Sequence, residues 1–391
     1  MLGGAATLLG AGFTAAPVEP MRLPVVRQIP LPAFPGAHAI WGAIAPDNAG
    51  GIWAGISADG GAKSAHLVRL DPVSGVVANH GDVLGQLARL GGRPPGESQV
   101  KIHSKIIQPG DGHFYFTSTD EDGEAEDGSA PPRWGSHLWR LRADGGAWEH
   151  LLAVPEGLTC AAGAGRTIWA LGLWDHVLYR YDIPSGAVRR VVVAAPGGHM
   201  SRNIVADVRG HAYVPRVRQA ADGSITADLL EFAPDMTVLA ETPLLNYAIG
   251  QTASTAHGII GLVNLADGGI AITTGAGAVH HIAPRADGPA VVTALGWFHP
   301  AGRAYAPCLF TWDGVRTLAG LAQVRDWEWD WVVFDLASRT SRAARLGIPP
   351  ESRPLLYGSD TRDAAGRFYV AGRHATPEGR GPILLQLDTG P

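Results

Sequence analysis

Short runs of apolar residues alternate with polar ones along the whole chain, and most runs end at Gly, Asp or Ser. A two-residue period indicates β-strands with one face in a core, and the intervening residues are typical of tight turns. One recurrent unit is an Asp-x-x-Gly-like turn followed by a strand with an aromatic or large apolar residue. Its six clear copies are Asn48–Trp53, Asp111–Tyr115, Gly165–Trp169, Asp207–Tyr213, Asp267–Ala271 and Asp363–Tyr369.

A second set of strands follows these copies at a regular distance. Its seven members are His66–Asp71, His137–Leu141, Val177–Asp182, Leu229–Phe232, Val279–Ile282, Trp331–Asp335 and Ile383–Asp388. We assign the divergent unit to the segment that starts near Trp297, represented by Cys308–Asp313. Regular repetition of short strands with turn signals predicts an all-β, seven-bladed β-propeller.

The two ends of the chain complement each other. The last unit stops after Ile383–Asp388 and lacks an outer strand, whereas Val25–Leu31 precedes the first unit without a blade of its own. We therefore predict that this N-terminal strand completes the last blade and closes the ring, which removes an exposed sheet edge. Residues 21–391 then form a single propeller domain.

Composition restricts the functional classes. The formal net charge of -5 provides no basic field for binding phosphates, so we expect no nucleic-acid partner. Residues 1–20 are apolar and rich in small residues, as in the remnant of an export signal, which predicts a secreted or periplasmic protein; the alternative is a disordered tail. The N-terminal stretch is too short to span a membrane, and no other segment is long or apolar enough to do so. The sequence leaves open whether Cys160 and Cys308 pair.

The innermost strands of a propeller begin at one face of the central channel, so their first residues converge. Here those positions are His38, His103, Cys160, Arg202, His257, Tyr305 and Tyr357–Asp360. This polar set predicts a binding site at the channel mouth; the alternative is a purely structural channel that holds water.

Two segments carry a resemblance to a known family. The first is Gln99–Ile107 with the following Asp111–Thr117, and the second is Gly197–Asn203 leading into Asp207–Tyr213. They resemble the β-propeller polysaccharide lyases, which include ulvan lyases and related enzymes that act on rhamnose and glucuronate linkages. The resemblance implies that His103 is the catalytic histidine, that Arg202 binds the substrate carboxylate with His199 nearby, and that the partner is an acidic polysaccharide or oligosaccharide.

The chemistry of such a lyase fits these residue types. β-Elimination from a uronate needs a base for the C5 proton, a cation for the carboxylate and an acid for the leaving oxygen. Where the lyases carry a second histidine and a tyrosine, this chain has Thr117–Thr119 and Leu173–His176. The candidates for the acid are therefore Tyr305, Tyr357 and His176, and the further substrate contacts that we expect are Lys105, His257 and a stacking wall from Trp134, Trp174 or the group Trp327–Trp331.

Other functions stay open from the sequence. One alternative is a glycoside hydrolase for a rhamnose-glucuronate linkage, and another is a non-catalytic propeller that binds glycan or protein. We expect no required cofactor, although the acidic loop Asp120–Pro132 leaves a structural calcium or other divalent ion open; its spacing does not match an EF-hand. His280 and His281 are adjacent on one strand and point to opposite faces, so they do not predict a metal site. We expect a monomer.

Overall fold

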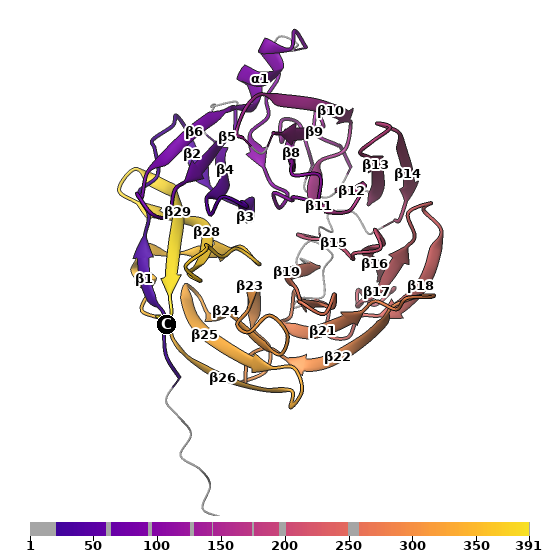
Figure 1. Cartoon of the computed structure of the whole chain (residues 1–391), viewed down its shortest axis with the longest axis vertical. Helices are drawn as coiled ribbons and strands as arrows, with labels where there is room; N and C mark the ends of the chain where they lie inside the picture. The colour runs from indigo at the N-terminus through magenta and orange to yellow at the C-terminus, as the bar shows by residue number, and fades with distance from the viewer. Residues whose placement is uncertain are drawn as a thin grey trace, which may run out of the picture.

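The computed structural model describes residues 21–59, 64–92, 96–125, 129–142, 144–173, 176–194, 201–248 and 258–390. In this part of the chain seven sheets stand side by side around a common centre (Figure 1). The predicted seven-bladed β-propeller is therefore confirmed.

The first four blades follow each other in chain order. Blade 1 contains β2 (Ala37–Ala39), β3 (Ile44–Pro46), β4 (Ile52–Ala58), β5 (His66–Leu70) and β6 (Val77–Asp82). Blade 2 contains β7 (Lys101–Ile102), β8 (Phe114–Thr119), β9 (Ser136–Leu141) and β10 (Trp148–Val154). Blade 3 contains β11 (Leu158–Ala164), β12 (Thr167–Gly172), β13 (Val177–Asp182) and β14 (Val188–Val192). Blade 4 contains β15 (Val205–Ala206), β16 (Ala212–Gln219), β17 (Ile225–Phe232) and β18 (Val238–Pro243).

The remaining blades complete the circle. Blade 5 contains β19 (Ile259–Asn264), β20 (Ile270–Thr274), β21 (Ala278–Ala283) and β22 (Val291–Trp297). Blade 6 contains β23 (Tyr305–Thr311), β24 (Thr317–Arg325), β25 (Glu328–Asp335) and β26 (Thr340–Arg345). Blade 7 contains β27 (Leu355–Tyr357), β28 (Phe368–Thr376), β29 (Gly379–Asp388) and β1 (Val25–Gln28), and the 3₁₀ helix η2 (Pro350–Ser352) precedes it.

The ring closes as the sequence predicts. Strand β1 pairs antiparallel with β29, with Val25 opposite Asp388 and Gln28 opposite Leu385, and lies at the rim beside it (Figure 1). The N–H of Ile29 then donates to the carbonyl of Leu384 (2.9 Å). The N-terminal strand thus supplies the outer strand of the last blade and covers its edge.

The turn before the second strand has the same hydrogen-bond geometry in different blades, which explains the repeated Asp-x-x-Gly-like pattern of the sequence. Asp207 accepts from the backbone N–H groups of Arg209 and His211 with Oδ1 and from the hydroxyl of Tyr213 with Oδ2. Asp363 makes the same set of bonds, including one from the hydroxyl of Tyr369. An aspartate here satisfies turn donors and fixes an aromatic residue of the next strand in the core.

Blade 6 corrects one boundary of the prediction. Cys308–Asp313 is not a further third strand: Cys308–Thr311 belongs to the innermost strand β23, while Trp312 and Asp313 start the following turn. The third strand of blade 6 is β25, as the tryptophan-rich segment predicts. Strands at different positions in a blade carry the same alternation, so the local pattern could not separate them.

Two other features concern the exterior and the core. Helix α1 (Val83–Arg89), which the sequence analysis did not anticipate, projects from blade 1 and is capped by Asp82, which accepts from the N–H of Gly85. None of the helices in the described ranges, this one included, is both long enough and apolar enough to span a membrane. Cys160 and Cys308 are both buried and form no disulfide.

Candidate functional site

A polar pocket lies among the innermost strands of the ring. Four residues that the sequence analysis selected line it together, His103, Lys105, Arg202 and Tyr357, although they come from blades 2, 4 and 7. Trp41 and Ser359 complete much of its wall. The open space at its centre is narrow, with room for about one water molecule.

A break in the β-ladder directs His103 into the channel. The sequence predicts a strand over Gln99–Ile107, but regular pairing stops after Ile102, and the hydroxyl of Ser104 accepts the N–H of Thr117 instead (2.9 Å). His103 is 5% exposed, and its Nδ1 lies 2.7 Å from the carbonyl oxygen of Thr159. A carbonyl only accepts, so Nδ1 carries the proton of the neutral ring and Nε2 is the nitrogen that can take up another.

Arg202 carries hydrogen-bonding capacity that the described residues do not use. Its Nε and Nη1 are buried and have no hydrogen-bond partner in the described part of the chain. The guanidinium carbon lies 4.5 Å from the ring centroid of Tyr357 and 5.9 Å from that of Trp41. The aromatic rings hold the cation in place through their π faces but leave two donors for a ligand.

Lys105 adds a second positive charge on the floor of the pocket. Its Nζ donates to the carbonyl of Ser359, and Asp360 is its charged neighbour. Burial lowers the pKa of Lys105, and burial also raises the pKa of Asp360, although the two charges attract each other. No aspartate or glutamate is among the described residues that line the pocket itself.

The three candidate acids occupy different places. Tyr357 lines the pocket, whereas Tyr305 lies outside its lining but close to Arg202. Burial raises the pKa of Tyr305 although the nearby guanidinium of Arg202 counteracts it. His176 is buried at the start of β13, further from the channel axis, and does not line the pocket.

Trp41 is the residue that the sequence analysis missed. It follows β2 and precedes Gly42, whose φ of +107° turns the chain toward β3. Three cations lie over its ring, with centroid distances of 5.5 Å for Lys101 Nζ, 5.9 Å for Arg202 Cζ and 5.0 Å for Arg373 Cζ. An aromatic residue directly before the first innermost strand was the signal that could have identified it.

None of the tryptophans expected to stack on a sugar is among the described residues that line this pocket. Trp134 is half-buried under Arg133, whose guanidinium carbon lies 4.9 Å from its ring centroid. Trp329 and Trp331 are buried in the core, and Trp327 is half-buried in the turn between β24 and β25. The candidates His199, Trp174 and His257, like residues 1–20, lie outside the described residues.

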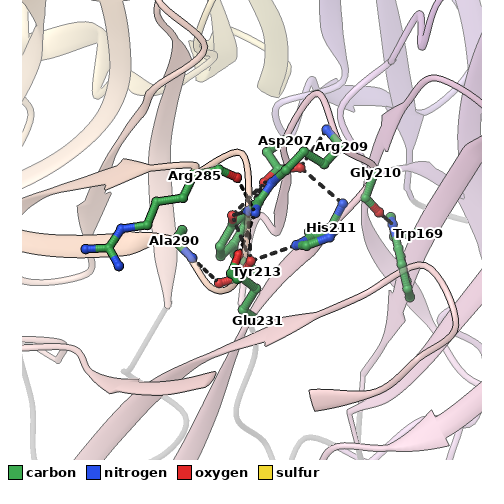
Figure 2. Close-up of polar contacts among 10 residues, drawn as sticks. Trp169, Asp207, Arg209, Gly210, His211, Tyr213, Glu231, Arg285 and Ala290 are labelled. Atoms are coloured by element: carbon green, nitrogen blue, oxygen red, sulfur yellow. Dashed lines mark hydrogen bonds and ion pairs between the residues drawn. The ribbon is translucent and has the colours of Figure 1, made fainter. Parts of the chain in front are cut away.

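A separate polar cluster in blade 4 contains possible metal ligands. Atoms of Asp207, His211 and Glu231 lie within 4.8 Å of one another. Figure 2 shows that Arg209 occupies the centre of this cluster, and its Nη2 donates to both Asp207 (2.6 Å) and Glu231 (2.8 Å). Because one guanidinium already donates to both carboxylates and offsets part of their charge, the cluster is better explained as a structural ion-pair network.

The same cluster joins two blades. Nη1 of Arg209 donates to the carbonyls of Arg285 and Gly288 in the β21–β22 connection, and Glu231 accepts the N–H of Ala290 (Figure 2). In the acidic loop, Asp120 likewise has a structural role, since it accepts from Ser98 and from the N–H of Asp122.

Comparisons with known proteins identify the fold only. No family model matches the chain, and no curated protein matches it. Among solved structures, the protein U3-55K is 11% identical, with 93% of this chain and 98% of that chain covered and a TM-score of 0.51. A fungal alcohol oxidase of the AA5 family in complex with copper is 12% identical, with 93% and 76% covered and a TM-score of 0.50. A chain of a nidogen/laminin complex is 16% identical, with 83% and 98% covered and a TM-score of 0.41.

Proposed function

We propose that this propeller is a polysaccharide lyase that binds a uronate of an acidic glycan in the channel pocket and cleaves the chain by β-elimination. The observation that carries the proposal is the buried guanidinium of Arg202, whose Nε and Nη1 have no partner among the described residues. Buried donors without partners are costly, so their retention fits a ligand that pairs with them. A carboxylate accepts two parallel bonds from a guanidinium.

His103 is the proposed base. Donation from Nδ1 to the carbonyl of Thr159 orients the ring and leaves Nε2 as the proton acceptor. Nε2 would take the C5 proton of the uronate, and the electrons of that C–H bond would form the C4–C5 double bond. The C4–O bond to the neighbouring sugar breaks in the same reaction.

The remaining charges have roles in the same scheme. Arg202 and Lys105 would stabilise the negative charge that develops on the carboxylate as the C5 proton leaves. Tyr357 is the candidate acid that the pocket geometry favours, because it lines the pocket next to Arg202, and its hydroxyl would protonate the leaving oxygen.

Hydrolysis has less support than elimination. Most glycoside hydrolases use a pair of carboxylic acids on either side of the scissile bond. The described lining of this pocket contributes none, and the nearby Asp360 is a single carboxylate beside Lys105. Elimination needs a base, an acid and a cation instead, and these groups are present in the lining.

The decisive experiment is an elimination assay. The protein would be incubated with polyuronates, and the ultraviolet absorbance of the unsaturated product would be followed. We expect turnover by the natural protein and by His113→Ala, which removes a histidine from the turn between β7 and β8. His103→Ala should lose at least about a hundredfold in rate, the usual scale of general base catalysis, while it still unfolds in one cooperative transition.

Three results would contradict the proposal. New reducing ends without absorbance would indicate hydrolysis, and binding without any cleavage would indicate a glycan-binding module. Full activity of His103→Ala would remove the assigned base.

A further inference from the structure

A group of cations surrounds Trp41 at the rim of the pocket. Lys101, Arg202 and Arg373 each lie within 6 Å of the centroid of this one ring. Arg202 faces the pocket, whereas Arg373 belongs to β28 of blade 7 and does not line it. Because both guanidinium groups contact the same ring, their carbon atoms are no more than about 11 Å apart.

The positive charge at this rim is only partly neutralised. Lys101 forms an ion pair with Glu121, but no ion pair to Arg373 occurs in the described part of the chain. Burial lowers the pKa of Arg373, and the neighbouring positive charges of Arg380 and Arg202 lower it further. Burial also lowers the pKa of His38, which makes an edge contact with Trp41, so this ring tends to be neutral and adds little positive charge, although the negative charge of Asp59 acts against the shift.

Repulsion among these groups favours a bound anion. Two guanidinium groups that share one aromatic ring repel each other, and an anion near them offsets that repulsion. The ring of Trp41 lies within 6 Å of three cations, so it helps to hold them in place through its π faces. The pocket cations are then available for one carboxylate and Arg373 for a second.

We propose that Trp41, Lys101 and Arg373 form a second anion subsite, so that the ligand is an acidic oligosaccharide with carboxylates on neighbouring sugars. One carboxylate would pair with Arg202 in the pocket, and the next would pair with Arg373 at the rim. This inference rests on the proposed uronate pocket and adds that a single uronate does not use the whole site.

Calorimetric titration of the full chain with galacturonate and with digalacturonate would test the second subsite. The experiments would use a His103→Ala background to prevent turnover. We expect the dimer to bind at least about tenfold more tightly than the monomer, because the second carboxylate gains a charge-assisted bond. Arg373→Gln should remove this preference while leaving the affinity for the monomer within about twofold.

The control Arg166→Gln removes the same charge from the exposed turn between β11 and β12 and should leave both affinities unchanged. Equal affinity for monomer and dimer, or an equal loss of both in Arg373→Gln, would overturn the second subsite while leaving the proposed lyase intact. A dimer preference that depends on Arg373, in a protein with the natural His103 that yields no unsaturated product, would support the subsite and reject the lyase. If neither uronate binds, both proposals are rejected.

Discussion

Replacing Arg202 by methionine tests whether this arginine serves ligand binding or the stability of the fold. Methionine has a similar length and can fill the space between the rings of Trp41 and Tyr357. In the natural protein the side chain spans this space with a charge whose Nε and Nη1 have no partner among the described residues. The substitution therefore removes ligand-binding donors without removing a hydrogen bond that these two atoms make in the fold.

The expected magnitude follows from the opposing contributions. Each buried donor without a partner costs about 1–3 kcal/mol, whereas each cation–π contact returns about 0.5–2 kcal/mol. Arg202 has two such donors and two such contacts. The middle of these ranges puts the cost of the two donors above the return from the two contacts by about 1–2 kcal/mol. We expect Arg202→Met to raise the free energy of unfolding by about that amount and to abolish binding of uronate.

Arg209→Met is the matched control. The Arg209 guanidinium is fully engaged with Asp207, Glu231, Tyr213 and two carbonyls, so its loss leaves two buried carboxylates without their cation (Figure 2). Breaking a buried pair in this way costs about 3–5 kcal/mol. Both variants would be unfolded in urea with tryptophan fluorescence as the signal. A loss of stability in Arg202→Met as large as that in Arg209→Met would show that Arg202 is a structural residue and would refute the reasoning.

Two further predictions concern stability. Deleting residues 1–31 removes β1 and the buried side chain of Ile29, whose burial alone contributes about 2 kcal/mol. We therefore expect a lower melting temperature and aggregation through the exposed edge of β29. An unchanged melting temperature would contradict the closure of the ring by β1. Burial lowers the pKa of His280 to about 4, and its Nε2 accepts the N–H of Leu245, so the folded state resists protonation. The stability due to neutral His280 is complete above pH 6.5 and should fall by about 3 kcal/mol as the pH decreases to about 4. In His280→Gln, which keeps an acceptor, the free energy of unfolding from urea titrations should depend less on pH across this range.

The local sequence was sufficient for most of the blade pattern. An aspartate that caps a turn and the aromatic residue that it holds are close in sequence, as in Asp207 with Tyr213 and Asp363 with Tyr369, so their pattern can be read without the fold. The absence of an outer strand in the last unit likewise identified β1 as its partner. The inner strand β23 was misplaced because alternation reports that a strand exists, not its radial position in a blade.

The site was only partly readable from the chain. His103 and Lys105 follow the short strand β7, Arg202 precedes β15 and Tyr357 ends β27. All four therefore lie on or beside innermost strands, and a propeller brings these strands together around its channel. The break in the ladder that aims His103 into the channel depends on the hydroxyl of Ser104 replacing a strand bond, which the alternation pattern did not reveal.

The sequence by itself therefore determined the blade repeat, the closure of the ring and the half of the pocket that lies on innermost strands, because each depends on local periodicity or on a count of strands. Only the tertiary structure showed which residues meet at the rim of the pocket. Trp41 belongs to the first blade and Arg373 to the second strand of the last, and no spacing in the sequence relates them. They meet because β1 closes the ring and sets blade 7 against blade 1, which brings charges from the two ends of the chain onto one aromatic face.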